Sequence, residues 1–142
     1  MKIALPLLSC ALLLGTALAA QKAAQPANDF AEYQGWMKSN AATAADLNQR
    51  LTAKDGAAAH TDVRKLQETL AMVMAYWQSR NVQDGVRFSL DGTYGLAQVD
   101  VLISQNKFDE AAASLKTAQT ACANCHKAHR GDKGADGSFT IK

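Results

Sequence analysis

Proline and cysteine are both scarce in this sequence. Of its 142 residues, two are proline and three are cysteine, and Pro26 is the last proline in the chain. The segments after Pro26 therefore lack the residue that most strongly breaks helices. Beyond residue 19 only Cys122 and Cys125 remain, so the second half-site that a structural zinc ion needs is missing. A structural zinc site is thereby disfavoured.

The sequence also lacks a strong charge of either sign. Its formal net charge is +2 at pH 7, and the lysines and arginines are scattered rather than clustered. We therefore expect neither a nucleic acid nor a membrane as a partner. The sequence has no adjacent set of serine, histidine and carboxylate, and no glycine-rich phosphate loop. These absences predict that the protein is not an enzyme.

The N-terminal segment is typical of a cleaved export signal. Lys2 precedes an apolar run from Ile3 to Leu18, and small residues surround its end at Ala17-Leu18-Ala19. We expect cleavage after Ala19, so that residues 1–19 are a signal peptide and the mature protein is soluble and periplasmic. The run is shorter than a comfortable transmembrane span. Lipidation at Cys10 is the alternative reading of this segment.

The most informative motif is Cys122-Ala123-Asn124-Cys125-His126. A Cys-x-x-Cys-His run is the attachment signature of a c-type haem, in which each thiol adds across one vinyl group and the histidine is the proximal iron ligand. A thioredoxin-like thiol pair would be expected between alternating strands and helices, which the alanine-rich surroundings do not resemble. The motif predicts one covalent haem c, held by Cys122 and Cys125, with His126 as axial ligand.

Four segments after Pro26 have apolar residues at helical rather than alternating spacing. The first helix is expected to be capped by Asn28 or Asp29, and Gly56 with the alanines after it is expected to form the first turn. Two glycines lower the helix propensity at the start of the expected third helix. The last three helices are expected from Thr61 or Asp62 to about Arg80 or Asn81, from about Asp91 to Gln105, and after Asn106.

The fourth segment repeats its apolar positions every seven residues, at Phe108, Leu115, Cys122 and His129. Because Cys125 also falls on this face, we expect both cysteines to point toward the core. Residues 131–142 are rich in glycine and aspartate, and this composition predicts a flexible C-terminal tail.

Residues 20–130 have the length of one small domain. Four amphipathic helices with short connections favour an all-α fold, an antiparallel up-down-up-down four-helix bundle whose core can hold a cofactor between facing helices. We expect the covalent haem near one end of this bundle.

With four helices and the haem motif in the last of them, the chain resembles the class II c-type cytochromes, which include cytochrome c′ and its low-spin, methionine-ligated relatives. The stretch from Cys125 to Arg130 belongs to the same resemblance. It implies that Arg130 lies near the proximal histidine and tunes that side of the haem. A plain charge complement to the helix C-terminus is the alternative role of Arg130. Relatives are often homodimers, so a homodimer stays open.

The resemblance also implies a sixth iron ligand. In the low-spin relatives a methionine of the first helix ligates the iron, and Trp36-Met37-Lys38 is similar to the Met-Lys pattern found there. Met37 is therefore the candidate distal ligand. Met74 lies on the apolar stripe of the second helix at comparable depth and is the alternative, and either methionine could instead be core packing.

The other two histidines are expected to have no axial role. His60 falls at the far end of the bundle, where a surface position is expected. His129 lies one turn beyond His126 on the same helix, where we expect packing or a hydrogen bond near the haem edge.

Two functions follow from these residues. In the first, Met37 completes six-coordinate iron and the protein carries single electrons between redox partner proteins. In the alternative, the iron is five-coordinate as in cytochrome c′, and a hydrophobic face that includes Trp36 and Met37 admits nitric oxide or carbon monoxide. A third interpretation is a haem-free helical module whose two cysteines form a disulfide.

Overall fold

The computed structural model describes residues 30–135 and 137–142. Within them the chain forms four helices followed by two short strands. The expected signal peptide, residues 1–19, and the expected cap at Asn28 or Asp29 lie outside the described residues. The elements are α1 (Phe30–Ala53), α2 (Gly56–Ser79), α3 (Gln83–Ser104), α4 (Phe108–His129), β1 (Arg130–Lys133) and β2 (Phe139–Ile141).

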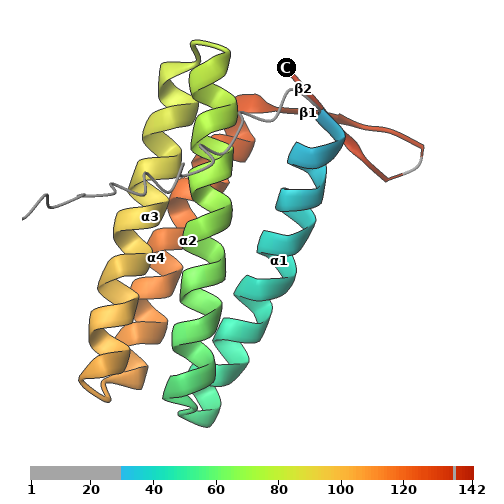
Figure 1. The fold of residues 1–142 in the computed structure, drawn as a ribbon. Helices are drawn as coiled ribbons and strands as arrows, with labels where there is room; N and C mark the ends of the chain where they lie inside the picture. The colour runs from blue at the N-terminus through green and yellow to red at the C-terminus, as the bar shows by residue number, and fades with distance from the viewer. Residues whose placement is uncertain (1–29, 136) are drawn as a thin grey trace, which may run out of the picture.

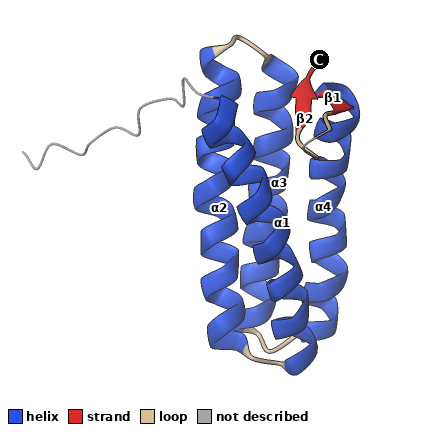
Figure 2. Cartoon of the chain, turned by 90° about the vertical axis from the view of Figure 1, so that its right-hand side faces the viewer, coloured by secondary structure: helices blue, strands red, loops and turns tan. Residues whose placement is uncertain are grey.

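The four helices lie side by side as a bundle (Figure 1). The turns that join α1 to α2 and α3 to α4 lie at one end, and the turn between α2 and α3 lies at the other end (Figures 1 and 2). Helix α3 packs against both α2 and α4, and α1 contacts α2 and α4. The prediction of an all-α chain with four helices is confirmed for its helical content. No helix in the described part of the chain is long and apolar enough to cross a membrane.

Helix α2 begins at Gly56, earlier than the predicted start at Thr61 or Asp62. The side chain of Asp55 accepts a hydrogen bond from the backbone N–H of Ala58 at 3.1 Å, which satisfies one of the free donors of the first turn. The alanines that follow have the highest helix propensity of any residue. The predicted turn at Gly56 was therefore wrong, because the true turn is only Lys54 and Asp55.

Helix α3 was also predicted to begin too late, near Asp91, because its glycines lower helix propensity. These glycines lie against residues of the neighbouring helices. A Cβ atom at Gly85 would lie 2.6 Å from Cγ of Trp77, and one at Gly95 would lie 2.6 Å from Cβ of Ala118. Close packing against α2 and α4 thus offsets the propensity cost, about 1 kcal/mol for each glycine.

The buried side chains form two clusters along the bundle. An aliphatic cluster fills the half that contains the end of α1 and the start of α2, and it includes Leu47, Leu51 and Val63. A mostly aromatic cluster fills the half that contains the start of α1 and the end of α4. Its buried members are Tyr33, Val73, Tyr76, Trp77 and Cys125.

Residues 131–142, predicted to be a flexible tail, instead contain most of an antiparallel β-hairpin. Arg130 pairs with Ile141 and Lys133 pairs with Phe139. The connection turns at Gly137, whose φ of +80° is readily available only to glycine. The hairpin lies at the end of the bundle where α1 begins and α4 ends (Figures 1 and 2). The prediction was wrong because it weighed glycine content and missed the alternation of Phe139, Thr140 and Ile141.

Candidate functional site

The last turns of α4 carry the whole Cys-x-x-Cys-His motif. Cys125 is buried, with 9% of its surface exposed, and His126 is half-buried. Cys122 is exposed, and both thiols are free. The expectation that both cysteines face the core holds for Cys125 alone. Cys122 is three residues away along the helix, so it lies at the edge of the same face.

A cavity opens beside the motif and is called here the apolar cavity. Cys122, Cys125 and His126 form one wall from α4. Aliphatic side chains of α2, such as Leu66 and Leu70, form another wall. Its empty volume is about 850 Å³, counted with the open mouth. The cavity itself has a volume of about 170 Å³, below the roughly 300–1,000 Å³ of pockets that hold organic ligands and cofactors. The motif therefore faces an apolar cavity that is open to solvent.

A second space, called here the hairpin cavity, lies between α1, the end of α4 and the strands. It has an empty volume of about 880 Å³, counted with open solvent. Lys38 and Arg130 bring positive charge to its lining, and Phe139 and Ile141 contribute from β2. The two cavities share a common wall. The shared residues are Tyr33, Met37, Ala41, Cys125 and His126.

Met37 and Met74 differ in their relation to these cavities. Met37 is half-buried on α1 and lines both cavities, together with Cys125 and His126. Met74 is half-buried on α2 and lines neither of them. Trp36, expected on the face opposite the histidine, also lines neither cavity. Of the two candidate methionines, Met37 is the one that the fold brings to the motif.

The cavity walls change the acid–base properties of the motif. Burial lowers the pKa of His126, and the positive charge of Arg130 lowers it further. The imidazole is therefore neutral at neutral pH and keeps a lone pair for a metal.

The pKa values of both thiols are raised, in contrast to that of His126. Burial, then the neighbouring Cys122 and Asp84, raise the pKa of Cys125 to about 11. Desolvation by neighbouring protein atoms also raises the pKa of Cys122, although this residue is exposed. Both thiols are thus protonated at neutral pH.

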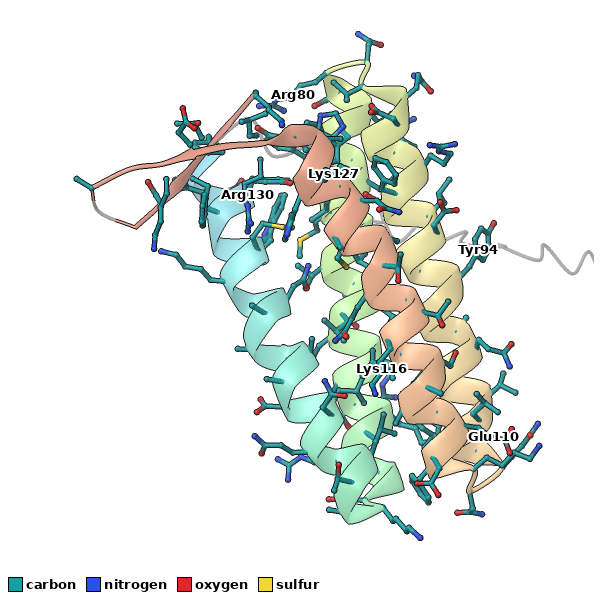
Figure 3. The ribbon with its side chains drawn as sticks, turned by 180° about the vertical axis from the view of Figure 1, so that it is seen from behind. Arg80, Tyr94, Glu110, Lys116, Lys127 and Arg130 are labelled. Atoms are coloured by element: carbon teal, nitrogen blue, oxygen red, sulfur yellow. The ribbon has the colours of Figure 1, made fainter. Side chains whose placement is uncertain are left out.

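Arg130 and His129 lie at the junction of α4 and the hairpin. The guanidinium carbon of Arg130 lies 4.3 Å from the centre of the Phe139 ring. Figure 3 shows Arg130 at the base of the hairpin, beside the space between α4 and α1. Arg130 thus lies close enough to His126 to affect its pKa. The resemblance implies this neighbourhood for Arg130, and its role there stays a prediction.

His129 packs against the indole of Trp77, with ring centroids 4.7 Å apart. Its Nε2 lies 3.1 Å from Oδ2 of Asp84 on α3, an ion-pair distance, although the contact is not aligned as a hydrogen bond. His60 lies in neither cavity, and its Nδ1 lies 2.6 Å from Oδ1 of Asp100. Neither histidine shares the apolar cavity with His126.

Sequence reasoning missed three features of the site, namely Tyr33, Asn40 and the hairpin. Tyr33 is buried, lines both cavities and lies 4.3 Å from the ring centre of Tyr76. Asn40 lines the apolar cavity, and its Oδ1 is buried without a hydrogen-bond partner. A polar residue three positions after Met37, on an otherwise apolar stripe, was the available signal for Asn40.

Among the described residues, no group of three or more histidine, cysteine, aspartate or glutamate side chains is arranged to hold a bare metal ion. A haem iron needs only axial ligands from the protein, because the macrocycle supplies the others. Comparison of the chain with models of known protein families, with curated proteins and with solved structures gave no match.

Proposed function

We propose that this protein is an exported c-type cytochrome that carries single electrons between redox partner proteins. In this proposal Cys122 and Cys125 hold one haem c through thioether bonds, His126 is the proximal ligand and Met37 is the distal ligand. One observation carries the proposal: these four side chains line a single apolar cavity. The proposal also takes up the resemblance to the class II cytochromes, with an antiparallel up-down-up-down bundle and the haem near one end.

The lining of the two cavities suits a haem. A haem is an apolar plate with two carboxylates, and the apolar cavity offers the aliphatic side chains of Leu66, Leu70 and Val73. Lys38 and Arg130 line the adjoining hairpin cavity, where their charges would complement the carboxylates. The donor set also fits, since two thiols, a neutral imidazole and a thioether are the side chains that c-type haems use.

The bound haem would supply the one-electron redox chemistry. The contribution of the chain is to hold the group, exclude water and keep the ligands in place. Trp77 and Tyr76 are almost fully buried next to Tyr33, so the wall behind the site is well packed. A packed wall moves little when the charge of the iron changes, which favours fast electron transfer.

The first test is haem attachment. The protein is produced with a c-type maturation system, denatured and extracted with acid acetone. We expect the wild type and the control Ala123→Ser to retain haem, because Ala123 is exposed between the two cysteines. The double variant Cys122→Ser, Cys125→Ser should lose it. A wild type that retains no haem would instead support a haem-free helical module.

The second test is the absorption spectrum in the visible and near infrared, oxidised and reduced, with and without carbon monoxide. Sharp low-spin bands, a sulfur-to-iron charge-transfer band and no response to carbon monoxide are expected for the electron carrier. Broad high-spin bands that shift on addition of carbon monoxide would support the alternative, a five-coordinate gas-binding protein like cytochrome c′. The aliphatic wall at Leu66 and Leu70 is the feature that would favour a small apolar gas.

A further inference from the structure

The outer face of α3 concentrates the exposed apolar side chains of the bundle. Among the described residues, the large hydrophobic side chains that are exposed are Leu90, Tyr94 and Val101, and all three belong to α3. Tyr94 leaves 70% of its surface exposed, and Figure 3 shows it pointing away from the bundle. Single apolar residues on a surface are ordinary, whereas a group of them on one face marks an interaction surface.

These side chains lie on one line along the helix. Tyr94 follows Leu90 by four residues and Val101 follows Tyr94 by seven, so at 3.6 residues per turn they share a narrow face. Exposed residues at alternating steps of three and four continue this line, and such spacing is that of the seam between two packed helices. We call this set the α3 seam, and its members are Arg87, Leu90, Tyr94, Ala97, Val101 and Ser104.

The residues of the α3 seam are complementary to a second copy of the same seam. From Leu90 to Val101 the seam carries no charged side chain, so two copies can face each other without bringing like charges together. When two copies of α3 lie antiparallel about a two-fold axis, Leu90 faces Val101 of the other copy and Tyr94 faces Ala97. Each contact then joins two aliphatic side chains, or a large ring and a small methyl group, as close helix packing requires.

The charges at the two ends of the seam favour the same arrangement. Arg87 lies near the start of α3, and antiparallel packing brings it beside the turn between α3 and α4 of the other copy. Glu110 lies on the first turn of α4, exposed and on the same side of the bundle as Tyr94 (Figure 3). Its Oε2 lies 3.5 Å from Nζ of Lys107, but an ion pair this exposed is weak, so the carboxylate can also pair with Arg87 of the other copy.

We propose that the α3 seam is a dimer interface, in which α3 of a second copy packs antiparallel against it. Helix α3 has 22 residues. A contact one helix wide, about 33 Å by about 10 Å, is smaller than the ~800 Å² per partner of a standard interface. The dimer is therefore reversible, with a dissociation constant in the micromolar range.

The interface lies away from the candidate site. Helix α3 packs against α2 and α4, the same two helices that α1 packs against, so α1 and α3 are diagonal in the bundle. Met37 and the hairpin lie on the side of α1 (Figure 1). A second copy on α3 thus leaves the hairpin cavity open, and the dimer does not depend on the proposed function.

Sedimentation velocity from about 1 µM to about 500 µM tests the dimer. The samples are the protein as purified from the c-type maturation system, Tyr94→Lys, and the control Gln49→Lys, which adds the same charge to an exposed position of α1. We expect the wild type and Gln49→Lys to dimerise alike. Tyr94→Lys should raise the dissociation constant at least about tenfold, because it places two like charges in the seam. Circular dichroism of each sample checks its helical content.

An exchange of charges tests how the two copies are oriented. Arg87→Glu and Glu110→Arg should each raise the dissociation constant about fivefold, because each brings like charges together across the interface. The double variant Arg87→Glu, Glu110→Arg restores opposite charges. Its dissociation constant should return to within about twofold of that of the wild type.

Three results would overturn the proposed interface. A wild type that stays monomeric over the whole concentration range would assign the α3 seam to a different protein. A dimer that Gln49→Lys weakens and Tyr94→Lys leaves intact would place the contact on α1. Charge reversals that weaken the dimer without recovery in the double variant would contradict the antiparallel packing.

Discussion

The side-chain amide of Gln34 donates a hydrogen bond to the backbone carbonyl oxygen of Phe139, with an N···O distance of 3.2 Å. This bond joins the start of α1 to β2, across 105 positions of sequence. Both residues line the hairpin cavity, together with His126. The hairpin is therefore part of the wall around the candidate site, and its contacts can be tested by substitution.

The first prediction concerns the ring of Phe139, which is half-buried and lies under the guanidinium of Arg130. Phe139→Ala removes this contact and part of the cavity wall. We expect the free energy of unfolding to fall by about 1–2 kcal/mol, less than the ~3–5 kcal/mol of a fully buried phenylalanine. Urea unfolding followed by circular dichroism measures the change.

The control for Phe139 is Thr140→Ala on the same strand, because Thr140 is exposed. It should stay within about 0.5 kcal/mol of the wild type. Equal losses in the two variants would mean that the strand, and not the ring, stabilises the hairpin.

The second prediction separates the two methionines. In the haem-loaded protein, Met37→Leu should convert the spectrum from low-spin to high-spin and open the iron to carbon monoxide, because leucine offers no ligand atom. Met74→Leu should keep the low-spin spectrum, since Met74 lines neither cavity. Absorption spectra with and without carbon monoxide decide the matter. A Met37→Leu protein that stays low-spin would remove Met37 as the ligand.

The third prediction uses two helical glycines in different surroundings. A Cβ atom at Gly95 would lie 2.6 Å from Cβ and 2.9 Å from Cα of Ala118, so Gly95→Ala forces α3 away from α4. We expect a loss of about 1–3 kcal/mol in the free energy of unfolding. Gly35 has no atom within 4 Å of its Cβ position. Gly35→Ala should stabilise the protein by about 0.5–1 kcal/mol, because alanine has the higher helix propensity.

Denaturant unfolding of the two glycine variants and of the wild type measures both the loss of stability in Gly95→Ala and the gain in Gly35→Ala. If Gly95→Ala were neutral, the close approach of α3 and α4 would not be needed for the fold. If Gly35→Ala were strongly destabilising, its surroundings would be more crowded than the structure indicates.

The fourth prediction is a pH dependence of the haem-free protein. The pKa of Cys125 is raised to about 11, from an ordinary value of 9.0, chiefly by burial. The folded protein holds the proton of Cys125 more tightly than the unfolded chain does. The stabilisation that results is complete below pH 9 and is lost as pH rises toward 11. We expect the free energy of unfolding to fall by at most about 2 kcal/mol over this range.

Other groups also titrate in this range, so the measurement compares urea unfolding of the wild type and Cys125→Ala at pH 8 and pH 10.5. The alkaline loss should be smaller in the variant. In the haem-loaded protein the sulfur is a thioether and cannot titrate, so the difference due to Cys125 should vanish. An equal alkaline loss in the wild type and Cys125→Ala would contradict the assignment to this thiol.

Much of the helical architecture could be predicted from local patterns. The seven-residue repeat from Phe108 to His129 predicted α4 with the correct start. The starts of α2 and α3 were predicted too late, at Thr61 or Asp62 and at Asp91, because glycine was taken as a breaker. Gly85 and Gly95 are tolerated in α3 because helices α2 and α4 approach them closely. That approach is a contact between distant parts of the chain, and no local pattern contains it.

By itself the sequence determined four amphipathic helices and the position of Cys122, Cys125 and His126 on the last turns of α4, because helical periodicity and motif spacing are local properties. Only the tertiary structure decided that Met37, and not Met74, lies beside the motif. It also decided that Asn40 has a buried atom without a partner and that β2 folds back onto α1. These features depend on how close residues far apart in sequence come to each other. That closeness is set by the packing of whole helices.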